Sequence, residues 1–410
     1  MQSASAEKKI TFPLLLLCLY ALAEYGRPPF LTPLHPGLVI QILLIILILK
    51  NVNKIKVVIK DIYFKLYMLL LIEMTVHVPI SANNYWAYKY WYIMLSYLVV
   101  GLSFCLFVDN VHKFRTFLTV FLLIHVLCAM DEMITGGSYF GGSYFMAESN
   151  DFAVAMNTVI PISLLMGFSS RGFRRVGYWL ATSLYIIANV LTFSRGGFIG
   201  MASVALCCWW SAKARVRNAL ILLIVGIAFF SIIPEGYKTE LFSIKEENYE
   251  SGTGRDRIEL WKVAWRIFNS SPIIGVGQGN STYILGDYQY EESGETSWKR
   301  RISGRAIHSL YFTILAELGI IGMLIFVFMI QNLYHKYRSI KKSSIENSNT
   351  LNSDEYIFLK NINVGLFVAL IGCLVSGAFL STFYYPQFWN LSALMTAIFM
   401  MKSRIAGKPQ

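Results

Sequence analysis

Long apolar segments, separated by short polar ones, recur along the chain from Ile10 to Met401. Most of them are roughly 15 to 25 residues long, which is enough to cross a hydrocarbon layer of about 30 Å as a helix. Their apolar residues are continuous, whereas the strands of a membrane barrel alternate with a period of two. We therefore expect an all-α polytopic membrane protein with about twelve transmembrane helices.

The first apolar segment has no small-residue cleavage site and is followed by many others, so we expect it to be a span and not a signal peptide. The expected spans are Ile10–Glu24, Pro33–Leu49, Ile62–Ile80, Tyr88–Val108, Phe117–Met130, Phe152–Phe168, Val176–Phe193, Phe198–Trp210, Ala219–Ile233, Leu310–Leu333, Phe358–Leu380 and Pro386–Met401.

Composition agrees with this pattern. Of 410 residues, 55% are hydrophobic and only 15% are charged, whereas soluble domains carry about a quarter charged residues. The net charge of +12 does not indicate a nucleic-acid partner, because the basic residues stand in alternate loops. The positive-inside rule then predicts that both termini are cytoplasmic. The basic groups are Lys50/Lys54/Lys56/Lys60, Lys113/Arg115, Arg171/Arg174/Arg175, Lys213/Arg215/Arg217, Lys336/Arg338/Lys341/Lys342 and Lys402/Arg404/Lys408.

The expected organisation has three parts. Residues 1–233 hold spans one to nine, residues 234–307 form a large periplasmic loop, and residues 308–410 hold the last three spans and a cytoplasmic tail. Long ordered loops are usually functional, so we expect the site in this insert. Within it, Asp256–Asn269 has the pattern of an amphipathic helix, which either lies on the membrane surface or covers the end of the bundle.

Aromatic residues gather where the outer membrane interface is expected. They are Tyr85, Trp86, Tyr88, Tyr90 and Trp91, and later Tyr384, Tyr385 and Trp389. Tyrosine and tryptophan are enriched at both membrane interfaces. We interpret most of these residues as an interfacial belt, with sugar stacking as the alternative.

Arg195 lies between two apolar segments with no loop on either side. A charge at such a position is costly unless it faces a polar cavity or a partner, so it indicates function, with a snorkelling or hinge arginine as the alternative. Arg255 and Arg257 stand at the start of the amphipathic helix, where the helix dipole favours an anion. With Arg195 they are candidates to bind a diphosphate bidentately, and ordinary pairing with nearby carboxylates is the alternative.

A second basic run, with Arg301 and Arg305, precedes the tenth expected span and is a candidate for binding the substrate or lipid phosphates. His308 follows at the outer mouth of that span, where an imidazole suits general acid or base work, although a lone histidine is often structural. Tyr311 comes one helical turn later. The histidines show no metal-ligand spacing, so we expect no metal, and we expect no cofactor. Gly275-Val-Gly-Gln-Gly279 lacks the lysine of a nucleotide-binding loop.

Three blocks together resemble the O-antigen ligase and polymerase superfamily, over about Asn189 to Ile330. Ser194-Arg195-Gly196-Gly197 is similar to the family's Ser-Arg-Gly at a helix junction. Gly254-Arg255-Asp-Arg257 to Trp261, with Pro272-Ile-Ile-Gly275-Val-Gly277, is similar to its Arg-x-x-x-Trp helix and glycine turn. His308-Ser-Leu-Tyr311 to Glu317-Leu-Gly-Ile-Ile-Gly322 is similar to its histidine and Glu-x-Gly-x-x-Gly.

Two positions depart from the family pattern. Ser309 stands where the family usually has asparagine, and Arg255 and Arg257 compete for one arginine position. Arg257 has the four-residue spacing to Trp261, so we favour it. The segment Asn150-Asp-Phe-Ala-Val-Ala-Met-Asn157 also resembles a branch of the superfamily associated with exopolysaccharides, which leaves the acceptor open.

The resemblance implies a GT-C-type membrane glycosyltransferase of the bacterial inner membrane whose site faces the periplasm. It implies that His308, Arg195 and Arg257 are catalytic, and that Arg255, Arg195, Arg305, Arg301 and Tyr311 bind the diphosphate or glycan. The expected reaction is a metal-independent, inverting transfer from undecaprenyl diphosphate to lipid A-core. The alternatives are polymerisation of O-antigen or exopolysaccharide repeats, and, less favoured, transfer to protein or flipping of a lipid-linked glycan.

Overall fold

The computed structural model of the protein describes residues 10–27, 33–135, 145–212, 216–217, 253–289, 302–342 and 353–405. Every regular element in these ranges is a helix, so the all-α prediction is confirmed for them. The ninth expected span, Ala219–Ile233, lies outside the described residues. The helices are α2 (Phe12–Ala21), a π-helical turn η1 (Leu22–Gly26), α3 (Pro36–Leu49), α4 (Val52–Val58), α5 (Ile62–Ile80), α6 (Asn84–Phe107), α7 (Val111–Thr135), α8 (Ser149–Phe168), α9 (Gly172–Leu191), α10 (Arg195–Ser211), α13 (Thr253–Ser270), α14 (Ser281–Ile284), a 3-10 turn η4 (Leu285–Tyr288), α15 (Leu310–Lys342), α16 (Ser353–Gly377) and α17 (Pro386–Ile405).

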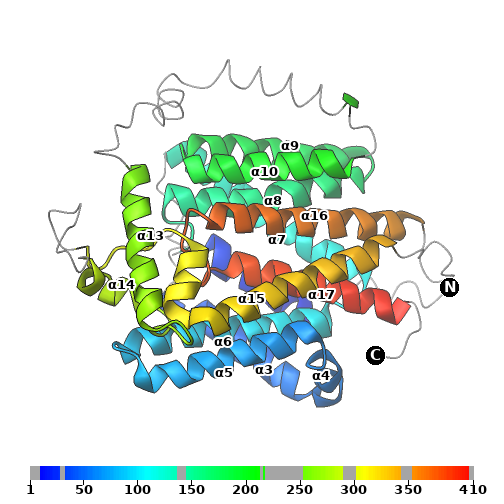
Figure 1. Ribbon diagram of the computed structural model, residues 1–410. Helices are drawn as coiled ribbons and strands as arrows, with labels where there is room; N and C mark the ends of the chain where they lie inside the picture. The colour runs from blue at the N-terminus through cyan, green and yellow to red at the C-terminus, as the bar shows by residue number, and fades with distance from the viewer. Residues whose placement is uncertain are drawn as a thin grey trace.

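The long helices lie side by side along one direction (Figure 1). Helix α8 packs against both α9 and α16, α5 packs against α6 and α15, and α17 packs against α6, α15 and α16. Helix α17 is buried along most of its length and has buried polar residues such as Gln387, Ser392 and Thr396. Because neighbouring helices shield it, α17 does not need an apolar surface.

Within the described residues, six helices are long and apolar enough to cross a membrane, or up to seven if the bent pair α3 and α4 counts as one span. They are α5, α6, α7, α8, α15 and α16. The chain is therefore a multi-pass membrane protein. Helices α2, α9, α10 and α17 overlap expected spans but do not meet this standard of length and hydropathy. The count of twelve spans remains a prediction.

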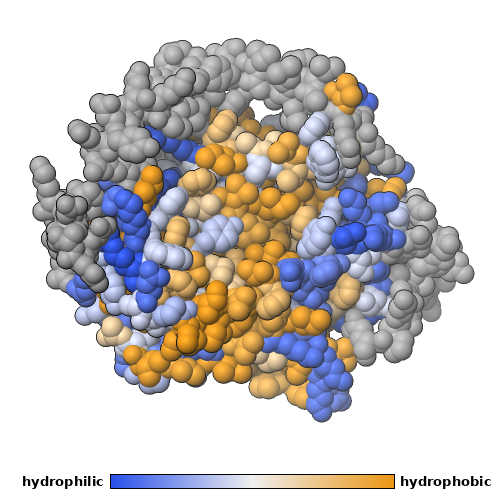
Figure 2. All heavy atoms as spheres, in the orientation of Figure 1, coloured by the Kyte–Doolittle hydropathy of each residue, from blue (hydrophilic) through white to orange (hydrophobic). Residues whose placement is uncertain are grey.

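Basic residues link neighbouring helices at one end of the bundle. Arg171 forms a 3.0 Å ion pair with Asp354, and Lys402 donates a 2.9 Å hydrogen bond to the carbonyl of Ser339. On the face seen in Figure 2, an apolar band separates hydrophilic side chains at the two ends of the helices. This arrangement is the one that the charge pattern predicts, and the assignment of the basic end to the cytoplasm stays a prediction.

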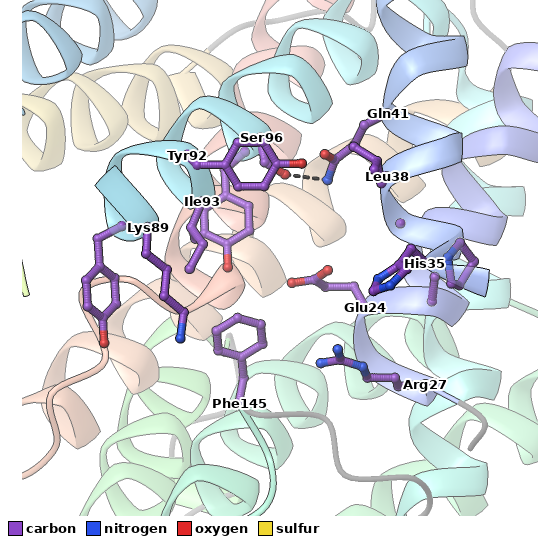
Figure 3. A pocket seen from close by; sticks show the side chains of 15 residues that line it. Glu24, Arg27, His35, Leu38, Gln41, Lys89, Tyr92, Ile93, Ser96 and Phe145 are labelled. Atoms are coloured by element: carbon purple, nitrogen blue, oxygen red, sulfur yellow. Dashed lines mark hydrogen bonds between the residues drawn. The ribbon is translucent and has the colours of Figure 1, made fainter. Parts of the chain in front are cut away.

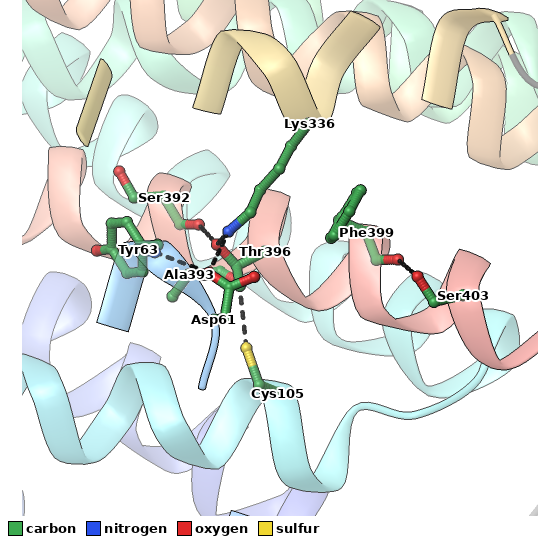
Figure 4. A network of polar contacts seen from close by, with 9 residues as sticks. All are labelled: Asp61, Tyr63, Cys105, Lys336, Ser392, Ala393, Thr396, Phe399 and Ser403. Atoms are coloured by element: carbon green, nitrogen blue, oxygen red, sulfur yellow. Dashed lines mark hydrogen bonds and ion pairs between the residues drawn. The ribbon is translucent and has the colours of Figure 1, made fainter. Parts of the chain in front are cut away.

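A buried ion pair lies at the same end (Figure 4). The Lys336 ammonium on α15 is 2.6 Å from the Asp61 carboxylate, and the two side chains are only 4% and 11% exposed. Lys336 also donates a 3.0 Å hydrogen bond to the Thr396 hydroxyl of α17, and Asp61 accepts a 2.8 Å bond from the N–H of Tyr63 at the start of α5. Each charge is therefore compensated, as burial requires.

Helix α13 lies across the opposite end of the bundle (Figure 1). Its apolar face, with Leu260, Val263 and Ile267, enters a second apolar cluster with residues of α14, η4 and α15. The amphipathic pattern thus predicted the helix, and of its two possible positions the structure shows the one that covers the bundle.

The glycine turn after α13 joins the insert to α15. The N–H of Gly277 donates a 2.8 Å hydrogen bond to the carbonyl of Glu317, and the N–H of Val276 a 3.0 Å bond to the carbonyl of Ala316. Gly275 has φ +73°, and a Cβ there would overlap the backbone of Glu317. Helix α15 is kinked at Gly319, where φ is 60°. These glycines therefore permit two backbones to meet closely.

Candidate functional site

Contacts from two other elements hold the backbone of His308. Its N–H donates a 3.0 Å hydrogen bond to the Ser381 hydroxyl, and its carbonyl accepts a 3.4 Å bond from the Trp261 indole of α13. The residue is left-handed, with φ 55°, a conformation that is uncommon outside glycine. Because both the N–H and the carbonyl of His308 are hydrogen-bonded, the backbone that carries the half-buried imidazole is held in place.

Ser309, the departure from the family pattern, immediately precedes α15. Its hydroxyl accepts a 3.5 Å hydrogen bond from the N–H of Phe312, and its carbonyl accepts a 2.7 Å bond from the Thr313 hydroxyl. Serine and asparagine cap helix N-termini about equally well. The serine therefore keeps the capping function that an asparagine would supply.

Arg257 projects from the first turns of α13 toward the same place. Burial lowers the pKa of its guanidinium, and so does the charge of Arg195. The two arginines are thus close enough for their charges to repel, although they are 62 positions apart in the sequence (257 − 195). Two half-buried like charges held near each other are expected where an anion binds between them.

Arg195 is the first residue of α10, and a polar network fixes that helix start. The Ser194 hydroxyl accepts a 2.9 Å hydrogen bond from the N–H of Gly197 and donates a 2.6 Å bond to Asn150 of α8. The Asn157 amide donates a 2.9 Å bond to the carbonyl of Gly197. A Cβ on Gly197 would overlap Ala153 of α8, so the glycine permits this close packing. The helix dipole adds positive potential beside the guanidinium.

Charged side chains from several segments act on the imidazole of His308. Burial lowers the pKa of its imidazole below the ordinary 6.5; Arg257 and Arg305 lower it further, and Glu148 opposes them. The imidazole is therefore neutral at pH 7 and able to accept a proton.

The other predicted substrate-binding residues have varied positions. Arg305 forms a 3.4 Å ion pair with Asp256 of α13, and both side chains are substantially exposed. The Tyr311 hydroxyl donates a 3.0 Å hydrogen bond to the carbonyl of Leu374, which joins α15 to α16. Arg301 and the side chain of Arg255 lie outside the described part of the chain, so the choice between Arg255 and Arg257 stays a prediction.

A cavity of about 690 Å³ lies near His308, although His308 does not itself line it. We call it the aromatic cavity. Its lining includes Ile307, which precedes His308 in the chain, and Ser381, whose hydroxyl accepts the hydrogen bond from the His308 N–H. It combines ring faces with hydroxyl and carboxylate groups, and its lining includes Trp86, Tyr90, Tyr283, Tyr384, Tyr385, Ser281, Thr282, Asp287, Thr313 and Glu317.

The belt interpretation of the aromatic residues is therefore wrong for part of the set. Trp86, Tyr90, Tyr384 and Tyr385 line the aromatic cavity, and Trp389 is fully buried in the core. Sequence reasoning named these residues, with sugar stacking as the alternative, but could not separate belt residues from cavity residues because both occur near the membrane interface. The pairing of Tyr90 with Tyr384, whose ring centroids are 4.3 Å apart, joins segments distant in sequence.

Glu317 forms the buried floor of this cavity. Its carboxylate accepts hydrogen bonds from the Gly279 N–H at 2.8 Å, the Ser281 hydroxyl at 2.5 Å and the Tyr384 hydroxyl at 2.6 Å. With its oxygens so occupied, Glu317 joins the insert, α15 and the segment before α17. We assign it to positioning the cavity wall.

The arrangement combines two arginines, a neutral imidazole and an adjoining polar, aromatic cavity. Such cations stabilise charge that develops on a leaving group, and such an imidazole takes a proton from a nucleophile. In the ranges that the structure describes, no group of three or more His, Cys, Asp or Glu residues has a metal-binding arrangement. The expectation of a metal-independent reaction stays untested by this finding.

Comparison with known proteins agrees with this geometry. No curated protein matches the chain significantly. A family model described as O-antigen ligase matches residues 180–327, nearly the stretch over which the motifs show their resemblance. That match includes Arg195, Arg257, Arg305 and His308, but it does not include Glu148. Residues 180–327 of this multi-pass membrane protein are therefore an O-antigen ligase family domain, which makes the protein an enzyme of the glycosyltransferase type, acting in glycan transfer of the O-antigen ligase or polymerase kind.

Proposed function

We propose that this protein transfers a glycan from undecaprenyl diphosphate to a hydroxyl of lipid A-core, at the periplasmic face of the inner membrane, with inversion and without a metal. The observation that carries the proposal is that Arg257, near the start of α13, interacts by charge with both Arg195, at the start of α10, and His308, just before α15. These two interactions support one shared group. The family match supports the class of reaction.

In the proposed step, the acceptor hydroxyl oxygen attacks the anomeric carbon of the donor glycan. The bond from that carbon to the diphosphate oxygen breaks, and its electron pair leaves with undecaprenyl diphosphate. The hydroxyl proton passes to the neutral imidazole of His308. A single displacement of this kind inverts the configuration of the anomeric carbon.

Arg195 and Arg257 stabilise the leaving group. The diphosphate gains negative charge as the bond breaks, and cations in a partly desolvated site act more strongly than in water. Guanidinium groups match pairs of phosphate oxygens, which lysine does not. The mutual repulsion of Arg195 and Arg257 is relieved when the diphosphate binds between them.

The aromatic cavity supplies the place for saccharide next to His308. Sugar rings present apolar faces and peripheral hydroxyls, and the cavity offers Trp86 and Tyr283 beside hydroxyls such as those of Thr282 and Thr313. Its volume of about 690 Å³ is in the ordinary range for a binding pocket. We assign it to the acceptor saccharide.

The test uses purified full-length protein, a lipid-linked donor, lipid A-core and excess EDTA. We expect glycan-bearing lipid A-core from the wild type, and losses of about 10²- to 10³-fold for Arg257→Gln and Arg195→Gln and about 10²- to 10⁴-fold for His308→Ala. Arg174→Gln, an exposed arginine at the other end of the bundle, is the matched control.

The products separate the alternatives. Longer glycans on undecaprenyl diphosphate, without glycan-bearing lipid A-core, would show a polymerase and overturn the proposed acceptor. Movement of donor across a vesicle membrane with no new glycosidic bond would show a flippase. Full activity of both His308→Ala and Arg257→Gln would remove the proposed site, and a strict requirement for Mg²⁺ would remove the metal-independent mechanism.

A further inference from the structure

A second cavity, of about 500 Å³, lies between η1, the start of α3 and the first half of α6 (Figure 3). We call it the N-terminal cavity. It is at the same end of the bundle as α13, because α6 begins there, where the N–H of Asn83 donates a 2.7 Å hydrogen bond to Asn280 of the insert. The function proposed above assigns no role to this cavity.

Charged side chains line the N-terminal cavity. Figure 3 shows Glu24 and Arg27 directed into it from one side and Lys89 from the other, with His35 at its edge. Glu24 and Arg27 are close enough for their charges to interact. Arg27 and Lys89 therefore leave an excess of positive charge over Glu24 among the described lining residues. The Lys89 ammonium also lies 4.5 Å from the centroid of the Trp86 ring. Charged groups within a membrane protein indicate a binding function, and a lining with net positive charge favours an anion.

The cavity also borders a surface suited to lipid. Leu38 lines it and is 47% exposed, and the exposed apolar face of α3 continues through Val39 at 52% and Ile42 at 49%. A polar head in the cavity would have its hydrocarbon chain against this face. The combination of cations inside and an exposed apolar face outside fits a phosphate ester carried on a lipid.

Packed rings separate the N-terminal cavity from the aromatic cavity. Tyr90 lines both cavities, and its ring lies 4.3 Å, between centroids, from that of Tyr384. Phe145 lines the N-terminal cavity, and its ring centroid is 5.2 Å from that of Tyr385 on the other side. The two cavities therefore share a wall, and a saccharide attached to a head group at Arg27 and Lys89 would have to pass these rings to reach His308.

We propose that the N-terminal cavity binds the phosphate of the lipid-borne acceptor, while its saccharide enters the aromatic cavity. The assignment of the acceptor saccharide to the aromatic cavity rests on the proposed function. The assignment of the acceptor phosphate to the N-terminal cavity rests only on the residues of that cavity. Two sources share this chemistry: the phosphorylated lipid A of a ligase acceptor and the polyprenyl phosphate of a polymerase acceptor.

Binding is measured by native mass spectrometry of the full-length protein with lipid A, undecaprenyl phosphate or dioleoyl phosphatidylglycerol. We expect lipid A or undecaprenyl phosphate to bind more tightly than phosphatidylglycerol. The Arg27→Gln/Lys89→Gln double variant should weaken that binding about tenfold, and Arg174→Gln should not. Leu38→Trp, which fills the mouth of the cavity from an exposed position, should weaken it similarly without removing a charge.

In the transfer assay, the double variant should raise the acceptor KM about tenfold and leave kcat and the donor KM unchanged. Equal binding of all three lipids would show a general phospholipid site and overturn the proposal, as would variants with undiminished affinity. If the wild type transfers no glycan, the proposed function fails. The comparison of lipid binding still tests whether the N-terminal cavity binds the phosphate.

Discussion

The backbone N–H of His308 donates a 3.0 Å hydrogen bond to the hydroxyl of Ser381, across 73 positions of sequence. Ser381 stands in the turn between α16 and α17, and its hydroxyl also lies 3.2 Å from the hydroxyl of Thr313, whose own proton is donated to the Ser309 carbonyl. The turn thus positions the backbone from which the imidazole projects. Positioning matters because small displacements of a catalytic group cost rate.

Ser381→Ala should therefore lower kcat about fivefold, the equivalent of one hydrogen bond of about 1 kcal/mol. The donor KM should stay unchanged because Ser381 lines the cavity that we assign to the acceptor saccharide and not to the donor. Ser270→Ala, which removes an exposed hydroxyl bonded to the carbonyl of Ile267 within α13, is the control. An unchanged kcat for Ser381→Ala would show that this bond does not position His308.

The pH dependence of kcat/KM should show an acid limb below pH 6.5, because the pKa of His308 is lowered from that value and only the neutral imidazole accepts a proton. Arg305→Gln removes a cation that lowers this pKa, so the limb should move to higher pH. Glu148→Gln removes a carboxylate that raises it, so the limb should move to lower pH. Shifts in the same direction, or none, would contradict the role of His308 as the base.

Gly275→Ala should abolish transfer in protein that still inserts into the membrane. Gly275 has φ +73°, and its Cβ would overlap the backbone of Glu317, so the insert would separate from α15. Gly177→Ala on α9, where a Cβ meets open space, should keep wild-type activity. Limited proteolysis of the insert would report the separation directly, and a wild-type digestion pattern with full activity for Gly275→Ala would count against this junction.

Lys336→Met should destabilise the protein by about 3–5 kcal/mol, because it leaves the Asp61 carboxylate buried without its charged partner. The double variant Lys336→Met/Asp61→Asn should recover much of this loss, since the amide carries no charge. Thermal unfolding in detergent measures both effects. Equal melting temperatures for the single and double variants would show that the ion pair is not the cause.

Sequence patterns predicted the helical class and the amphipathic helix α13 because continuous apolar segments and helical periodicity are local properties. They also singled out Arg195, Arg257 and His308, each of which is chemically unusual at its position. The choice between a surface position and a covering position for α13 depended on the second apolar cluster, which is formed by residues distant in the sequence.

The aromatic and N-terminal cavities did not follow from sequence. Tyr90 of α6 and Tyr384 of the turn before α17 are far apart along the chain, and their ring contact is a property of packing alone. The sequence alone does not mark Arg27 or Lys89 as a binding residue, because charged residues are common near helix ends. Only the fold brings them to opposite sides of one space.

The most direct test of the central claim is a double-mutant cycle on single-turnover transfer rates, with Arg195→Gln, Arg257→Gln and the combined variant. If both arginines stabilise the same leaving diphosphate, each single loss should be about 10²- to 10³-fold, and the combined loss should fall well short of the product of the two. Losses that multiply fully, or a single variant that keeps the wild-type rate, would contradict a shared action on the diphosphate.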